Sequence, residues 1–329
     1  MEARVIDAYA KAGSCPEEDE LILTNYLEGR RISLAVCGAP SLKRGLIEHI
    51  AAKHMLALPL KLAVGSKKDV RSSDIAKAHA IESLRNVDEF IFINSSLAVA
   101  SPALCTVAGT NCKDDIGTAI SIARACSSYA ISQGKIFVQT NSLVNKAGLA
   151  ECANKLQHSP SLVLRSHAAS TMTMLPFVTE NLCSPRELAL QLLLCLPKRL
   201  GGFGLTVPTA NKAMNLNSVQ SSICGRKYLV PDLFWEKAAL DVEYNGYEYH
   251  SYQDQIESDK TRRAALKLAG IEVIEVDDAI ISSVGETRKV ANRIAQRNNL
   301  KLETRGPSFG EKHMALRSRL LHPSSAETA

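Results

Sequence analysis

Two carboxylates lie close together in the chain, each on a short segment with β-strand character. The segment 228–234 carries Asp232 directly after a proline, and the segment 239–244 carries Glu243, with Asn245 two residues further on. Oxygen ligands of this kind suit Mg²⁺, which usually takes only one or two carboxylates from a protein. A cation held there could polarise a phosphate and activate a water molecule. The residue types therefore allow a divalent-metal site on two neighbouring strands, which the spacing by itself does not establish.

Alternation along an extended strand gives the second segment two different faces. Asp241, Glu243 and Asn245 share one face, and the residues between them point the other way, towards a core. A turn around 236–239 would pair the two segments as a hairpin and allow Asp232 to lie opposite the polar face. Spacing alone also allows an alternative, in which Asp232 and Glu243 are ordinary acids at a strand end and on an exposed face.

A helix is expected immediately before this hairpin. Ser184 is a plausible N-cap, Pro185 follows at the first helical position, and Glu187 lies at the third, where it completes a capping box. The helix is expected to reach about Cys195 or Leu196.

The elements after the hairpin predict how the sheet is completed. A helix is expected over 254–269, stopped by Gly270, then a strand over 271–276 that is apolar enough for burial on both faces, and a last helix over 279–297. Because the last strand joins the sheet after a crossover helix, the sheet must be mixed.

The first 180 residues are expected to form a separate α+β domain of unknown role. Its expected elements are a helix over 46–55, a strand over 60–64, a hairpin over 89–99, a helix that starts at Ser101-Pro102, helices over 115–131 and 142–156, and a polar connector over 158–179.

Composition limits the class of protein. Hydrophobic residues make up 46% of the 329 residues, which is enough for sizeable cores in about two domains and excludes a disordered chain. The net charge of +5 permits contact with a polyanion without by itself arguing for one. The nine cysteines include no CxxC pair and are expected to be reduced. With no long apolar run and no signal-peptide core, the chain is expected to be cytoplasmic and not to bind membranes.

The last part of the chain, 301–329, is basic and rich in serine and proline. It is expected to be a flexible basic tail that includes at most a short helix near 311–321. A solvated tail and a phosphate-binding arm are the two interpretations.

The residues from 184 to 300 resemble a known family, the very-short-patch-repair-like endonuclease domains of the PD-(D/E)XK nuclease superfamily. The resemblance rests on the order of elements and on Pro231-Asp232, Glu243-Tyr244-Asn245-Gly246, His250, Gln255, Asp259 and Arg262-Arg263 before LKLAGIEVIEV. It implies a restriction-endonuclease-like α/β core, a mixed sheet flanked by helices, over 181–300. More loosely, KLAVGSKKDVRSS and VASPALC resemble the preceding region of uncharacterised actinobacterial and abortive-infection antitoxin-like proteins.

The family resemblance implies metal-binding roles for three acids. Asp232 would bridge the metal to the phosphate and Glu243 would be the second metal carboxylate, with Mg²⁺ or Mn²⁺ as the ion and no organic cofactor. Glu187 matches an acid that the superfamily often carries near the metal, so a site role and a capping role compete and can coexist.

Four further residues are implicated by the same resemblance. His250 would orient water, contact the phosphate or act as a base, or else it is a surface histidine near a helix start. Lys260, Arg262 and Arg263 would neutralise phosphate charge or form a solvated helix face.

Asn245 departs from the family pattern, which has lysine or aspartate at this position. Asparagine can offer an oxygen to a metal but cannot take up a proton. We therefore carry two main hypotheses: a metal-dependent DNA endonuclease or nickase, and a catalytically weak or inactive nucleic-acid-binding regulator of a toxin–antitoxin or phage-defence system. An interaction scaffold on a decayed nuclease fold is a third reading. The expected partner is DNA, and a homodimer is left open.

Overall fold

The structure is a computed structural model in which the chain divides into two compact units, Met1–Leu175 and Pro176–Thr328. It describes residues 34–36, 44–53, 58–64, 73–80, 90–94, 97–132, 136–246, 264–302 and 307–321. The fold class is mixed α/β, as expected, and the second unit contains a mixed sheet flanked by helices. The expected domain boundary near residue 180 lies close to the observed division.

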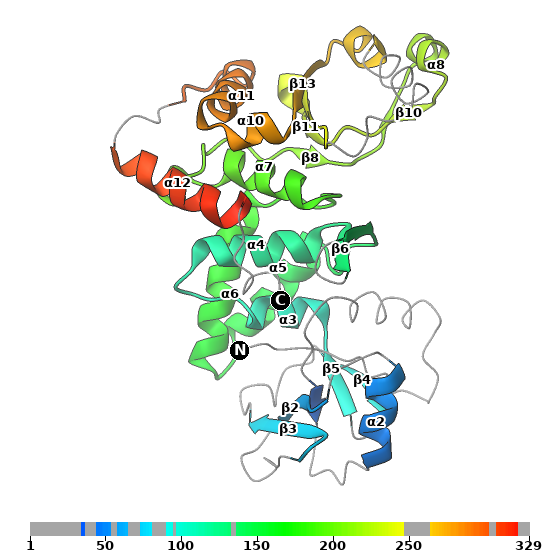
Figure 1. Ribbon diagram of the computed structural model, residues 1–329, viewed down its shortest axis with the longest axis vertical. Coiled ribbons are helices and arrows are strands. Elements are labelled where there is room, and N and C mark those ends of the chain that lie inside the picture. Colours follow the sequence, from blue (N-terminus) through cyan, green and yellow to red (C-terminus); the bar gives the residue numbers. More distant parts are fainter. Residues whose placement is uncertain are drawn as a thin grey trace. The chain divides into compact units, whose positions relative to one another are not determined.

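A five-stranded sheet lies at the start of the first unit (Figure 1). Its strands are β1 (Leu34–Val36), β2 (Leu60–Val64), β3 (Ala76–Ala80), β4 (Phe90–Asn94) and β5 (Leu97–Ala100), in the order β3-β2-β1-β5-β4. The strands β1, β2 and β3 are parallel, whereas β4 and β5 form the antiparallel hairpin that the sequence predicts.

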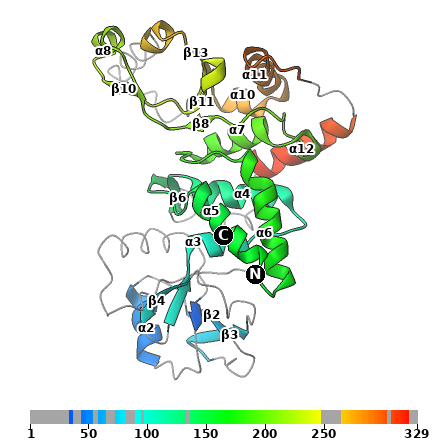
Figure 2. The same ribbon diagram turned by 180° about the vertical axis from the view of Figure 1, so that it is seen from behind.

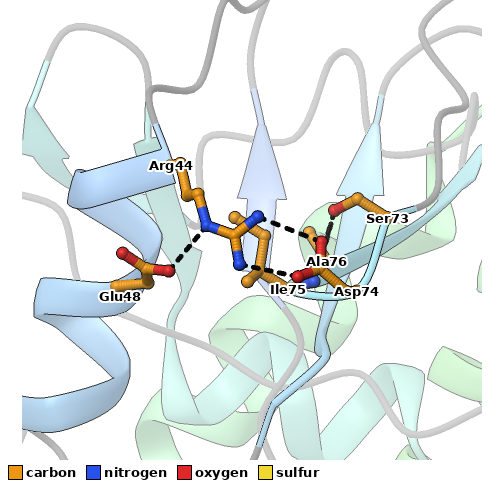
Figure 3. Close-up of polar contacts among 6 residues, drawn as sticks. All are labelled: Arg44, Glu48, Ser73, Asp74, Ile75 and Ala76. Carbon is orange, nitrogen blue, oxygen red and sulfur yellow. Dashed lines mark hydrogen bonds and ion pairs between the residues drawn. The ribbon is translucent and has the colours of Figure 1, made fainter.

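An arginine connects the helix α2 (Arg44–Lys53) to the turn before β3. Arg44 donates from Nη2 to Asp74 Oδ2 at 2.6 Å and from Nη1 to Asp74 Oδ1 at 3.3 Å, and its Nε donates to Glu48 at 2.8 Å (Figure 3). The hydrogen bonds from Arg44 hold the pKa of Asp74 below its usual value. The groups are exposed, so this contact positions the helix more than it stabilises the unit.

Four helices complete the first unit: α3 (Pro102–Ala108), α4 (Asp115–Cys126), α5 (Lys146–Gln157) and α6 (Leu162–Met174). Side chains cap their N-termini, among them Ser101 as predicted.

Two of the expected boundaries in the first unit are wrong. The helix expected over 115–131 ends at Cys126, and β6 (Tyr129–Ser132) follows and pairs with β7 (Ile136–Gln139). The expected connector over 158–179 contains α6, whose buried Leu164, Ala168 and Thr171 follow helical spacing among polar residues.

The second unit is built on a four-stranded sheet in the order β13-β12-β11-β8 (Figures 1 and 2). The strands β8 (Thr209–Ala210), β11 (Leu233–Trp235) and β12 (Leu240–Tyr244) are antiparallel neighbours, and β13 (Glu272–Val276) lies parallel to β12. The helix α7 (Pro185–Cys195) comes before them. The mixed sheet is confirmed, although the sequence did not predict β8.

The hairpin between β11 and β12 forms as expected. Its turn is the 3-10 helix η5 (Glu236–Ala238), followed by Ala239 with a left-handed backbone at φ 47°. The turn pairs Trp235 with Leu240 and Leu233 with Val242. This register decides which side chains share a face of the sheet.

The elements after the hairpin differ from expectation in two respects. The strand β13 is mostly half-buried rather than buried on both faces. The expected last helix is two helices, α10 (Asp278–Ser282) and α11 (Val284–Arg297), because Ser283 is extended and its Oγ caps α11 by accepting from the Glu286 N–H. Gly270 follows the helical residues 264–268 with φ 72°, as a stop signal requires.

The short helix expected near 311–321 is present as the longer α12 (Pro307–Leu321), so the expectation of a flexible tail does not hold for this segment. His313 is buried on this helix and donates from Nδ1 to the carbonyl oxygen of Gly201 at 2.7 Å. Its ring lies 4.9 Å from the Phe203 ring and 5.4 Å from the Phe309 ring. Arg317 is also buried and donates to the Ile281 carbonyl oxygen. Buried contacts of His313 and Arg317 therefore hold α12 against the rest of the second unit, although the composition of this segment indicated exposure to solvent.

Within the described residues, no helix is both long and apolar enough to cross a membrane.

Replacing Gly201 with alanine is expected to dislodge α12. Gly201 has φ 92°, and an added Cβ would lie 2.3 Å from the carbonyl oxygen of Lys312. Gly225→Ala is a matched control, because Gly225 has φ 65° and open space around the added Cβ. We expect a loss in the free energy of unfolding of about 1 kcal/mol for the control and roughly 3 kcal/mol for Gly201→Ala. Urea denaturation followed by the fluorescence of Trp235, the single tryptophan, measures both, and equal losses would contradict the contact.

The stability of the second unit is expected to fall as His313 is titrated. Burial, and then the nearby Arg317 and Arg288, lower its pKa, and its buried Nε2 has no hydrogen-bond partner among the described residues. Below about pH 6.5, His313 is therefore protonated in the unfolded chain but not in the folded chain. The free energy of unfolding decreases as the pH falls from there towards the depressed pKa of the folded chain. The urea midpoint should fall less between about pH 7.5 and pH 5.5 in His313→Gln than in the wild type. The exposed His158 gives the control, His158→Gln, which should keep the full loss.

Candidate functional site

Three acids lie side by side across the strands β11, β12 and β13. Glu243 on β12 is the register partner of Glu275 on β13. Asp232 immediately precedes β11, and continuation of the β11–β12 register places it opposite Glu243. We call Asp232, Glu243 and Glu275 the acidic row. The hairpin thus brings together the two carboxylates that the sequence singled out.

The acidic row lies next to a covered part of the same face of the sheet, which begins two residues away along each strand. Phe234, Asp241 and Val273 are register partners there, and Asp241 is completely buried. Phe234 and Val273 pack against an apolar cluster that includes Ala265 and Leu266. The helical residues 264–268 therefore cover one part of this face, and the acidic row lies at the edge of the covered part.

Asp232 and Glu243 differ in exposure. Asp232 is half-buried, and its Oδ2 accepts a hydrogen bond from the Tyr244 N–H at 3.0 Å, which directs the carboxylate towards β12. Glu243 is 6% exposed. Two carboxylates on adjacent strands in partly dehydrated surroundings repel each other, so the arrangement favours a positively charged ligand.

Glu187 belongs to the cap of α7, and its carboxylate is also linked through Asn211 to the chain next to Asp232. Its N–H donates to Ser184 Oγ at 3.1 Å, as in a capping box, but its Oε2 accepts from the N–H of Cys183 rather than of Ser184, at 2.9 Å. The same oxygen accepts from Asn211 Nδ2 at 2.9 Å. The N–H of Asn211 in turn donates to the carbonyl oxygens of Pro231 and Asp232. Asn211 thus connects α7 to the acidic row.

Burial and the negative charges near Asp232 raise the pKa values of Glu187 and Cys183. The pKa of Glu187 is raised mainly by burial and then by the charge of Asp232, against the hydrogen bonds from Cys183, Ser184 and Asn211. The pKa of the Cys183 thiol is raised to about 11, mainly by burial and then by the charges of Glu187 and Asp232. The site is therefore a region of negative potential.

Asn245 donates a hydrogen bond to one member of the acidic row. Its Nδ2 donates to Glu275 Oε2 at 3.2 Å, and its backbone N–H donates to the Val276 carbonyl oxygen at 2.8 Å. The amide thereby orients Glu275 in the arrangement described. This contact gives Asn245 a structural role at the position where the family pattern has an ionisable residue.

Sequence reasoning missed Glu275 and Asn211. Alternation along the segment 272–276 separates Glu275 from Glu272, but only the register with β12 shows that Glu275 lies beside Glu243. Asn211 follows a two-residue strand and has φ 49°, a combination that leaves little sequence signal.

The other residues of the predicted site, His250, Lys260, Arg262 and Arg263, lie outside the described residues, as do Gln255 and Asp259. Among the side chains that the structure describes, no group of three or more His, Cys, Asp or Glu could hold a metal ion. The described part of the site therefore offers a pair of carboxylates with further acids nearby. No disulfide joins the six cysteines whose side chains the structure describes, Cys105, Cys112, Cys126, Cys152, Cys183 and Cys195.

Comparison with models of known protein families found no match, and neither did comparison with curated protein sequences or with solved structures.

Glu187→Gln is expected to stabilise the second unit at neutral pH. The raised pKa of Glu187 means that its charged form is disfavoured in the folded chain, so ionisation costs stability above that pKa. The amide oxygen of glutamine can still accept the bonds from Cys183 and Asn211. The urea midpoint should therefore be higher than in the wild type at about pH 7.5, with the difference shrinking towards about pH 5 as the wild-type carboxyl is protonated. A lower midpoint at both pH values would contradict the repulsion from Asp232.

Proposed function

We propose that the chain is a metal-dependent DNA endonuclease or nickase that binds its divalent cation through Asp232 and Glu243. The observation that supports it most is the register of β11 with β12, whose continuation by one residue places Asp232 opposite Glu243. The mixed sheet preceded by α7 and completed by the parallel strand β13 is the order of elements on which the resemblance to PD-(D/E)XK nucleases rests.

The chemistry of the donor groups suits Mg²⁺ or Mn²⁺. Mg²⁺ is usually held by one or two carboxylates and keeps several waters, so a pair of carboxylates is a sufficient protein contribution. Cys183 is the neighbouring soft ligand, and its raised pKa keeps the thiol protonated near neutral pH. When bound, the cation would supply Lewis-acid activation of water and phosphate.

The residues around the pair would have positioning roles. Asn211 and the Cys183 N–H fix the Glu187 carboxylate next to Asp232, and Asn245 fixes Glu275 next to Glu243. Asn245 itself cannot accept a proton, so a general base must come from another group.

A second candidate function is favoured by the hydrogen bond from Asn245 to Glu275. At this position the family pattern has an ionisable residue, whereas the neutral Asn245 side chain donates a hydrogen bond to Glu275 and cannot take up a proton. On this alternative the chain is a regulator that binds nucleic acid without cutting it. It would show DNA binding that weakens with salt and no cleavage with any divalent metal.

Substitution of Asp232 with asparagine is the test of the nuclease proposal. Supercoiled and nicked DNA would be incubated with the whole chain and Mg²⁺ or Mn²⁺, and the rate of strand cleavage measured. We expect a loss on the order of 100-fold, typical of removing one preorganised electrostatic group from an active site. Glu236→Gln is the charge-matched control, because the exposed Glu236 lies on the turn at the far end of the same two strands.

Two results would reject the nuclease proposal. One is equal cleavage by the wild type and Asp232→Asn, and the other is no cleavage by the wild type in either metal. Salt-sensitive DNA binding in the second case would favour the regulator.

A further inference from the structure

The chain leaves the sheet between β8 and β11 and returns after an excursion that we call the ribbon segment, residues 212–230. It consists of β9 (Met214–Asn215), α8 (Ser218–Cys224) and β10 (Tyr228–Leu229), and the strands pair antiparallel, with Met214 opposite Leu229. In both views of the second unit, α8 lies at the opposite end from α11 (Figures 1 and 2).

Buried contacts fix the base of the ribbon segment. Leu229 is 1% exposed and packs with Leu266 and Ile271, and Met214 and Leu216 pack against the same cluster. The N–H of Leu216 donates to the Lys227 carbonyl oxygen at 2.9 Å, and α8 has a capping box between Asn217 and Gln220. The ribbon segment is therefore held in a defined position on the sheet.

Both ends of the ribbon segment meet the candidate site. It begins after Asn211, which hydrogen-bonds Glu187, and it ends just before Asp232, the first acid of the acidic row. The two ends of the ribbon segment are thereby placed next to the residues around these carboxylates.

The charge of the ribbon segment is opposite to that of the site. The sequence from 211 to 231 contains no aspartate or glutamate, and its charged side chains are Lys212, Arg226 and Lys227, all exposed. A polyanion approaching the acidic row meets repulsion, which an adjacent segment with positive charge would offset.

Exposed apolar side chains accompany these charges. Tyr228 is 54% exposed on β10, and Val219 and Ile223, one helical turn apart on α8, are 62% and 41% exposed. Aromatic and apolar side chains beside basic ones suit contacts with bases and sugars as well as phosphates.

We infer that the ribbon segment is a docking surface for double-stranded DNA, with Lys212 and Lys227 binding phosphates beside the acidic row. The inference deepens the proposed function and rests on it for the choice of nucleic acid. A two-stranded β-ribbon fits the major groove of B-form DNA, whereas the deep, narrow major groove of an RNA duplex does not admit it.

The test is DNA binding by the double variant Lys212→Ser/Lys227→Ser. Affinity of the whole chain for a short labelled DNA duplex would be measured by fluorescence anisotropy over a salt series, with EDTA present so that no cleavage occurs. Loss of two phosphate contacts should weaken binding at low salt and reduce the slope of log affinity against log salt by about two. An unchanged urea midpoint from Trp235 fluorescence shows that the variant is folded.

Lys198→Ser/Lys237→Ser is the control with the same change in charge. Lys198 is exposed beyond the C-terminal end of α7. Lys237 is exposed on the turn between β11 and β12, at the other end of the hairpin from Asp232. The control should keep the wild-type slope. An equal reduction in both double variants, or no reduction in either, would overturn the inference. Equal binding of an RNA duplex, lost in the same variant, would overturn its assignment to the DNA groove.

The docking inference and the nuclease proposal fail in different ways. If the wild type cuts DNA and Lys212→Ser/Lys227→Ser binds and cuts as well as the wild type, the docking inference is wrong while the nuclease proposal stands. If no cleavage occurs but the variant loses the two contacts, the docking surface stands without the nuclease.

Discussion

The register between β11 and β12 is the constraint on which the second unit depends. A shift of one residue would turn Glu243 to the opposite face of the sheet and separate it from Asp232. The short turn at Glu236–Ala238 and the buried partners Trp235 and Leu240 fix that register. Because of it, two carboxylates that would separate in water are held on adjacent strands.

The charge of Asp232 acts on the groups around it. The pKa values of Glu187 and Cys183 are raised mainly by burial, and repulsion from the charge of Asp232 raises both further. Hydrogen bonds from Asn211 and from the Cys183 N–H to Glu187 partly offset that repulsion. A divalent cation would offset it further, and the basic ribbon segment extends the same compensation to a polyanionic partner.

Local patterns in the sequence predicted the hairpin, the capped helix α7 and the mixed sheet, because each depends on neighbouring residues. What the sequence did not show depends on long-range contacts. Glu275 joins the acidic row only through the parallel register of β13, and His313 is buried only because α12 reaches Gly201 from more than a hundred residues away. The helix α6 was missed because serine and threonine interrupt its buried face.

Titration calorimetry with Mn²⁺ on the whole chain and on Glu243→Gln tests most directly whether Asp232 and Glu243 form a metal site. The account predicts saturable heat for the wild type and a much weaker response for the variant, because Glu243 would lose its charge without losing its place in β12. No heat in the wild type, or the same heat in both proteins, would contradict it.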